Sequence, residues 1–388
     1  MNNKKSILFI LHLPPPVHGA AMVGKYIMDS ELINSKFDCH YINLAIASSI
    51  ENIGKVGIKK IWKFQQLLHT IRREVKQLNP DYVYITPNAK GGAFYKEWVI
   101  VMMLKIMGCR IVAHYHNKGV SSRQDKWLDN WMYQRFFNKI KAILLAEALY
   151  SDIQKYVCRK DVFICPNGIP SVGLLEPRAL GVMEKNDVPR LLFLSNLLAD
   201  KGVLVLLDAL KILKDKGYSF ICDFVGGETK DIDAERFTQE VGKRNLNESA
   251  IYYGKKYGAE KEAFFATADI FVFPTYYHNE CFPLVLLEAM QHGLPIVTTN
   301  EGGISDIVKD GVNGLICKKK DAQSLASKIE RMISDKELRN SMGKYGKKMY
   351  EEQFTLEVFE KRIYNVLEKL ILEIEEPFKD KTEMLCLN

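Results

Sequence analysis

Two glutamates, Glu280 and Glu288, stand eight positions apart around the predicted start of a short helix. Pro283 suits the first helical position and Gly293 suits the residue just past the end. The start of such a helix presents unpaired N–H groups and about half a positive charge, which suits a diphosphate. Carboxylates on either side can then hold sugar hydroxyls. The ordinary alternative is that one glutamate lies in a solvated loop and the other on an exposed helix edge.

The segments around these glutamates are predicted strands. Asp269–Pro274 is the apolar run before them, and Gly293–Thr298 supplies a turn and a second strand after them. Strand, loop, two-acid helix and strand in this order resemble the donor site of retaining glycosyltransferases with the GT-B fold. That large family, glycosyl transferases group 1 (family 4), carries Glu, seven residues and Glu. With exceptions, the resemblance extends from Ser6 to about Leu370.

The resemblance implies an α/β protein of GT-B architecture, with two Rossmann-like doubly wound domains facing each other across a cleft. In this family a lysine and an arginine meet the donor diphosphate. Lys201 matches the lysine, whereas the arginine position is Asn196. Glu280 is expected at the sugar hydroxyls and Glu288 at the ribose. The expected site comprises the catalytic groups Glu280, Lys201 and His116 and the substrate-binding groups Gly19, Asn196, Phe282, Leu284, Glu288 and Gly254.

The implied reaction retains the anomeric configuration by front-face attack, and the departing β-phosphate takes the acceptor proton. No cofactor or metal is expected, because a lysine and a helix dipole can neutralise the diphosphate. Asp231 and Asp233 could hold a cation, but they open a predicted helix, where acids cap free N–H groups. His114 and His116 share one face of a predicted strand, and no third ligand accompanies them.

Length and composition favour two domains. The chain has 388 residues, 47% hydrophobic and 26% charged. Strands that end in glycine alternate with helices, which predicts parallel sheets with sites at the strand C-termini. We expect an acceptor-binding domain over residues 1–178, a linker over 179–189, a nucleotide-sugar-binding domain over 190–355, and a C-terminal helix over 356–388 that crosses back to the first domain.

Charge is distributed unevenly along the chain. Residues 1–178 hold 25 Lys and Arg against 13 Asp and Glu, a net of +12, which leaves −5 for the remainder of the total of +7. Residues 55–76 and 123–141 combine bases with tryptophans, which suits an anionic membrane surface. Outer helices of a doubly wound domain are an equally good interpretation. These basic residues come without a recognisable nucleic-acid-binding fold, which argues against nucleic acid as a partner.

Eight cysteines without paired spacing indicate neither a disulfide framework nor a zinc site. No run of 18 uncharged apolar residues occurs, and the first apolar run is too short for a signal peptide. We therefore expect a cytoplasmic protein that can lie at the inner face of the cell membrane.

The expected function is transfer of a sugar from a nucleotide-sugar to a glycan or lipid-linked glycan, as in lipopolysaccharide or capsule synthesis. Two alternatives share the architecture. One is a nucleotide-sugar epimerase, and the other is a protein that binds nucleotide-sugars without turnover. The sequence does not identify the donor sugar, the base, the acceptor or the linkage.

Overall fold

The computed structural model describes residues 4–16, 18–44, 58–172 and 188–375. Contacts divide the chain into two compact units. The first comprises Met1–Asn167 together with Leu356–Asn388, and the second comprises Gly168–Thr355. The division thus falls at Asn167, before the expected boundary at residue 178, and most of the predicted linker lies outside the described residues.

The first unit contains a six-stranded sheet of order β2-β1-β3-β4-β5-β6, and every neighbouring pair is parallel. The strand order reverses between β1 and β3, as in flavodoxin-like folds. The reversal leaves a crevice at the carboxyl ends of these two strands, where ligands of such folds bind. The strands are β1 (Ser6–Leu11), β2 (Asp38–Asn43), β3 (Tyr82–Ile85), β4 (Ile111–Tyr115), β5 (Ile140–Leu144) and β6 (Val162–Ile164).

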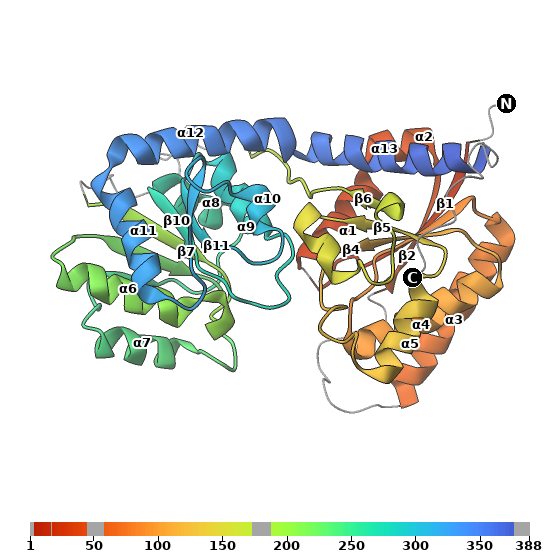
Figure 1. The fold of residues 1–388 in the computed structure, drawn as a ribbon, viewed down its shortest axis with the longest axis horizontal. Coiled ribbons are helices and arrows are strands. Elements are labelled where there is room, and N and C mark those ends of the chain that lie inside the picture. The colour runs from red at the N-terminus through yellow and green to blue at the C-terminus, as the bar shows by residue number, and fades with distance from the viewer. Residues whose placement is uncertain (1–3, 17, 45–57, 173–187, 376–388) are drawn as a thin grey trace. The chain divides into compact units, whose positions relative to one another are not determined.

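Helices cover the first sheet (Figure 1). The last of them, α13, buries the apolar residues Phe359, Ile363, Leu367 and Leu370, and Tyr364 packs on Phe37 with ring centroids 5.9 Å apart. This long-range packing places the C-terminal helix in the first unit. A 3₁₀ segment, Glu147–Asp152, follows β5. The helices are α1 (Gly19–Asp29), α2 (Glu31–Lys36), α3 (Ile58–Leu78), α4 (Gly91–Ile106), α5 (Trp127–Phe137) and α13 (Leu356–Glu375).

The second unit contains a parallel six-stranded sheet of order β12-β11-β10-β7-β8-β9. Numbered within the unit, this is the Rossmann order 3-2-1-4-5-6, and the reversal lies between β7 and β10. The strands are β7 (Arg190–Leu194), β8 (Ile221–Val225), β9 (Ala250–Tyr252), β10 (Ile270–Phe273), β11 (Ile296–Thr299) and β12 (Gly314–Cys317).

The central strands of this sheet are continuous apolar runs because helices cover both faces. All four residues of β10 are buried, for example. The α/β fold class predicted from the sequence is confirmed. The helices are α6 (Val203–Asp215), α7 (Ala234–Lys243), α8 (Gly258–Thr267), α9 (Leu284–Gln291), α10 (Ile304–Ile307), α11 (Ala322–Ser334) and α12 (Lys336–Gln353), with a 3₁₀ turn, η6 (Ala199–Lys201), before α6. None of the described helices is long and apolar enough to cross a bilayer.

Candidate functional site

The strand reversal of the second unit brings together two of the predicted site residues. Lys201 ends η6, which follows β7, and Glu280 lies in the loop after β10. Their charged atoms, Nζ and Oε2, are 2.5 Å apart. The Lys201 side chain is only 16% exposed and that of Glu280 only 10%, so water screens the pair weakly. A lysine just before a helix-opening glycine is ordinarily solvated, but Lys201 is instead largely buried against Glu280.

Aromatic and hydroxyl groups complete the surroundings of this pair. The Lys201 ammonium lies 5.3 Å from the ring centroid of Phe273 and 4.9 Å from that of Tyr277, within the range of cation–π attraction. The Thr275 hydroxyl donates to Glu280 Oε2 at 3.4 Å. The ammonium, the carboxylate, two aromatic rings and a hydroxyl group thus lie together at one edge of the sheet.

Two glycines allow the loops to approach closely at this edge. Gly202 has φ +87°, and a Cβ there would lie 2.3 Å from the carbonyl oxygen of Pro274. Gly302 has φ +58°, and its Cβ would lie 2.1 Å from the carbonyl oxygen of Glu280. Any larger residue would push Lys201 or Glu280 away, since the obstructing atoms are backbone.

Helix α9 begins at Leu284, with Pro283 as its N-cap, so the prediction that Pro283 is the first helical residue is wrong by one position. The Phe282 side chain is buried and lies 6.0 Å, between ring centroids, from Phe354. Leu284 is half-buried. What these two residues can offer a ligand is therefore their backbone N–H groups, which a helix start leaves without intrahelical partners. Gly293 follows the helix with φ +69°.

Glu288 is half-buried on α9 and is paired with a lysine that the sequence analysis missed. Its Oε1 lies 3.0 Å from Nζ of Lys261 on α8. Burial raises the pKa of Glu288, and the charge of Lys261 opposes this rise. His292 Nε2 approaches Glu262 Oε2 at 3.1 Å on the same two helices. Lys261 was not predicted because α8 was not predicted, and only the tertiary packing brings it to Glu288.

Asn196 lies at the carboxyl end of β7, where its Oδ1 accepts a hydrogen bond from the N–H of Gly227 at 3.1 Å. Gly254 follows β9 with φ +69°, and its carbonyl accepts from the N–H of Gly226 at 2.9 Å. Both residues therefore lie at the carboxyl edge of the sheet, on the side of β7 away from β10.

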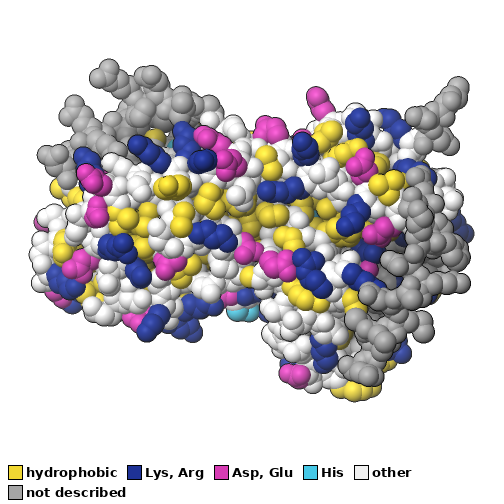
Figure 2. Space-filling model, turned by 45° about the horizontal axis from the view of Figure 1, so that its top comes forward, with side chains coloured by type: hydrophobic (Ala, Val, Ile, Leu, Met, Phe, Trp, Pro, Cys, Tyr) yellow, Lys and Arg dark blue, Asp and Glu magenta, His cyan; other side chains and the backbone are white. Residues whose placement is uncertain are grey.

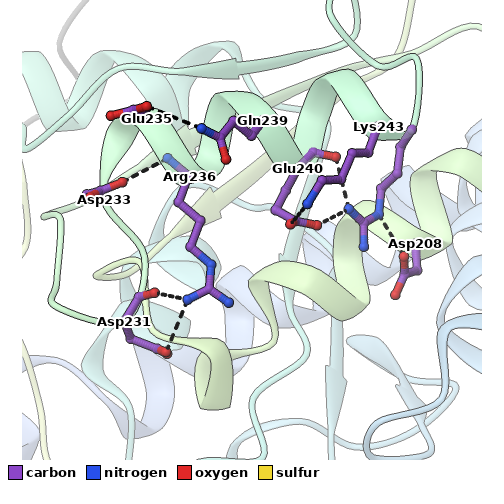
Figure 3. A network of polar contacts seen from close by, with 9 residues as sticks. Asp208, Asp231, Asp233, Glu235, Arg236, Gln239, Glu240 and Lys243 are labelled. Atoms are coloured by element: carbon purple, nitrogen blue, oxygen red, sulfur yellow. Dashed lines mark hydrogen bonds and ion pairs between the residues drawn. The ribbon is translucent and has the colours of Figure 1, made fainter.

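Asp233 caps the backbone of α7, and Asp231 lies beside the guanidinium of Arg236, with Oδ1 3.9 Å from Nη1 (Figure 3). Asp233 is the N-cap of α7 and accepts from the N–H of Arg236 at 2.8 Å, which confirms the predicted cap. Asp231 Oδ2 accepts from the N–H of Ala199 at 2.7 Å. Over the described ranges, no group of three or more His, Cys, Asp or Glu side chains could hold a metal ion. Metal independence itself stays a prediction.

Several histidine side chains lie near the strand reversal of the first unit. His12 follows β1, and its Nδ1 lies 3.2 Å from Oγ1 of Thr86, which follows β3. His116 follows β4, and its ring centroid is 4.2 Å from that of His114. Both ring nitrogens of His116 are buried, and among the residues that the structure describes neither has a hydrogen-bond partner. Gly19 is the first residue of α1, directly after the N-cap His18.

These imidazoles are neutral at physiological pH. Burial, together with the neighbouring His18, lowers the pKa of His12 to about 4, and burial, together with His12 and His18, lowers that of His116 to about 3. The adjacent acid Glu97, 3.8 Å from His12, is buried, and its pKa is raised to about 7. Hydrogen bonds from the N–H and side chain of Asn88 hold this carboxyl group in place. The sequence analysis missed His12, His18 and Glu97, although a polar residue directly after a predicted strand was an available signal for His12.

Comparison with known proteins gives a family match that lies within the second unit. The family model "Glycosyl transferases group 1" matches residues 182–349. The capsular polysaccharide biosynthesis glycosyltransferase CapM of Staphylococcus aureus is 29% identical over 47% of this chain and 47% of its own length. The N,N'-diacetylbacillosaminyl-diphospho-undecaprenol alpha-1,3-N-acetylgalactosaminyltransferase of Campylobacter jejuni is 24% identical over 71% of this chain and 73% of its own.

The match thus spans about half the length of several curated relatives, CapM among them. Among solved structures, HepE of Anabaena in complex with UDP superposes with a TM-score of 0.72 over 94% of this chain and 100% of that one, at 16% identity. A structural match at 16% sequence identity shows similarity of fold alone. The chain therefore has the GT-B fold, and its residues 182–349 match the model of the glycosyl transferases group 1 family.

Proposed function

We propose that this protein is a retaining, metal-independent glycosyltransferase. It moves a sugar from a nucleotide-sugar to a glycan or lipid-linked glycan acceptor in the synthesis of a cell-surface polysaccharide. The observation that carries the proposal is the Lys201–Glu280 pair at the strand reversal of the unit that contains the family match. A diphosphate needs a cation and a sugar needs a hydroxyl acceptor, and this pair offers both within one hydrogen-bond length.

In the proposed reaction the bond between the anomeric carbon and the diphosphate breaks, and the acceptor oxygen bonds to that carbon on the same face. The acceptor proton passes to an oxygen of the departing β-phosphate. Lys201 and the N–H groups of Phe282 and Leu284 stabilise the charge that develops on the leaving group. Glu280 holds sugar hydroxyls and Glu288 holds the ribose. Catalysis is then mainly positioning and electrostatic stabilisation.

In the first unit, the neutral imidazole of His116 suits sugar hydroxyls, because it offers one donor and one acceptor that no group of the described residues engages. Gly19, at the start of α1, allows backbone to approach a ligand closely. The relatives named for capsule synthesis and for a diphospho-undecaprenol acceptor support a carbohydrate acceptor, free or lipid-linked. The complex of HepE with UDP supports a nucleoside diphosphate leaving group.

Incubation with a panel of nucleotide-sugars tests this proposal. Release of nucleoside diphosphate that depends on added glycan or lipid-linked acceptor supports a transferase, and the anomeric configuration of the product decides between retention and inversion. A changed donor sugar without acceptor would indicate an epimerase. Binding of the nucleotide-sugar without either product would reduce the protein to a binding module. Equal rates with EDTA and with added Mg²⁺ would support metal independence.

A further inference from the structure

Lys255 follows β9 and Gly254, and its side chain lies across a glycine of the neighbouring strand end. A Cβ built on Gly227 would lie 2.2 Å from Lys255 Cε and 2.9 Å from Asn196 Oδ1. The lysine side chain and the Asn196 amide therefore converge on one small patch of backbone. Glycine at position 227 leaves the space through which Lys255 runs.

This patch is a rigid platform joined to the turn that carries Lys201. The N–H of Leu197 donates to the Gly227 carbonyl at 2.8 Å, and the hydroxyl of Thr229 donates to the Leu197 carbonyl at 2.7 Å. The N–H of Ala199, in the η6 turn, donates to Asp231 at 2.7 Å. Four hydrogen bonds, with that from Gly227 to Asn196, thus link the loops after β7 and β8. Lys255 rests on a surface whose shape these bonds determine.

Lys255 is a cation without a local counter-charge. It is exposed, and across the described ranges no hydrogen bond or ion pair engages it. The nearest acids in the neighbouring loop have other partners. Glu228 accepts from the N–H of Ala234 at the start of α7, and Asp231 accepts from Ala199. The charge of Lys255 is therefore available to a ligand.

The surroundings of Lys201 lack a net positive charge of their own. Lys201 is already neutralised by Glu280 at 2.5 Å, so the pair presents almost no net charge to an incoming anion. A nucleoside diphosphate carries several negative charges, and uncompensated anionic oxygens at a protein surface bind weakly. A second cation at the carboxyl edge of the same sheet supplies the net positive charge that the Lys201–Glu280 pair lacks.

We propose that Lys255 is a second phosphate-binding cation of the donor site and contacts the diphosphate from the β8–β9 side, over Gly227. This inference rests on the proposed function, since the diphosphate belongs to the nucleotide-sugar. A flexible lysine carried on a fixed glycine platform can reach toward the phosphates while Asn196 holds the platform in place. The Lys255 side chain then contributes to phosphate binding both through its positive charge and through its position over Gly227.

Calorimetric titration of the full chain tests this role. The probe is whichever of UDP, GDP and ADP binds wild type most tightly, compared with its nucleoside. Lys255→Met should weaken nucleoside diphosphate binding by about tenfold, the lower range for one charge-assisted hydrogen bond, and should leave nucleoside binding unchanged. Lys255→Arg should retain most of the affinity. Lys256→Met is the matched control, because the neighbouring Lys256 pairs with Glu260 at 3.0 Å.

A second pair of variants tests position separately from charge. Gly227→Ala keeps the lysine but occupies its path, so it should weaken diphosphate binding in wild type and have little further effect on Lys255→Met. Undiminished diphosphate affinity in Lys255→Met, or an equal loss for the nucleoside, would overturn the role of Lys255 and leave the proposed function intact. Failure of wild type to bind any of the three diphosphates would overturn the proposed function itself.

Discussion

Each sheet of this molecule reverses its strand order beside its first strand, β1 or β7, and the side chains at the two reversals differ in charge. In the second unit the crevice between β7 and β10 holds a charged pair, Lys201 and Glu280. In the first unit the crevice between β1 and β3 holds His12 beside Thr86, and burial keeps this imidazole uncharged at neutral pH. A parallel sheet therefore provides the place for a ligand, whereas the residues that follow each strand determine which chemistry it can bind.

The contrast separates two kinds of recognition. The Lys201–Glu280 pair has a net charge near zero, but it offers an ammonium to a diphosphate and a carboxylate to hydroxyl groups, and its low exposure weakens screening by water. Neutral imidazoles with unpaired nitrogens favour hydroxyl groups, which both donate and accept. The two crevices are thus suited to the phosphate part and to the carbohydrate part of the proposed reaction.

The largest expected effect is at the charged crevice. Lys201→Ala should lower turnover by roughly a hundredfold to a thousandfold, the range for losing one electrostatic donor in a preorganised site. It should also weaken UDP binding in calorimetric titration. Lys211→Ala, which removes an exposed lysine paired with Asp215 on α6, is the matched control.

Loss of Lys201 also leaves the Glu280 carboxylate without its partner in a buried position, so thermal unfolding midpoints must accompany the kinetics. The double variant Lys201→Ala/Glu280→Gln removes that unpaired charge and should recover stability without recovering UDP binding. If UDP affinity were unchanged by Lys201→Ala, the phosphates would bind elsewhere and our placement of the donor would be wrong.

A smaller effect should separate the two glutamates of the second unit. Glu288→Gln should weaken UDP binding by about tenfold, as expected for a lost charge-assisted hydrogen bond to the ribose. Glu280→Gln should leave UDP binding unchanged or tighter, since it releases Lys201, while sugar transfer falls. Titration of UDP and steady-state kinetics on both variants measure this split. Equal losses of UDP affinity would refute the separate roles.

The sequence was sufficient to predict the sheets and the donor-side loops because those features are local. Buried parallel strands are continuous apolar runs, and residues such as Lys201 and Glu280 lie in the loops that follow them. Strand β2 was missed because it lies at the sheet edge and most of its residues are only partly buried. The pairing of Glu288 with Lys261 could not be predicted, since it depends on how α8 packs beside α9.

The pKa values of the first unit predict how pH affects stability. Between the ordinary histidine pKa of 6.5 and the lowered values of His12 and His116, the unfolded chain binds protons that the folded chain excludes. The free energy of unfolding therefore falls as pH decreases through this range, by up to about 1.4 kcal/mol per pH unit for each histidine. Glu97 acts in the opposite direction, because its raised pKa lets the folded chain hold a proton between about pH 4.5 and 7.

His116→Asn should accordingly flatten the dependence of unfolding free energy on pH between pH 4.5 and 6 by about one proton. Denaturant unfolding at several pH values measures the slope, which a general loss of stability would not change. His69→Asn, on the exposed side of α3, is the control. Parallel curves for wild type and His116→Asn would show that the imidazole is not held neutral by burial, and the comparison of the two crevices would fail.

The smallest expected effect concerns the outer surface of the first unit. Trp62, in the second turn of α3, is 60% exposed, and Trp127, the first residue of α5, is 80% exposed. Helices that follow parallel strands start at the carboxyl edge of the sheet, so both rings lie toward the ligand side. The exposed bases Lys63 and Lys126 adjoin them. Figure 2 shows basic and acidic side chains interspersed over the face drawn, so no single basic patch dominates that face.

We expect the full chain to bind anionic vesicles through these aromatic and basic side chains. A fragment of residues 1–178 is unsuitable for this test, because it lacks α13, whose apolar residues are buried in the first unit. Lys63→Gln should weaken sedimentation with phosphatidylserine vesicles by up to about fivefold, since each base near such a surface contributes about 1 kcal/mol. Added salt should shrink the difference, because exposed charges are screened within about 8 Å at physiological ionic strength. Lys318→Gln makes the same change of charge on the second unit, so an equal loss from both variants would mean that net charge alone, and not this edge of the first unit, directs binding.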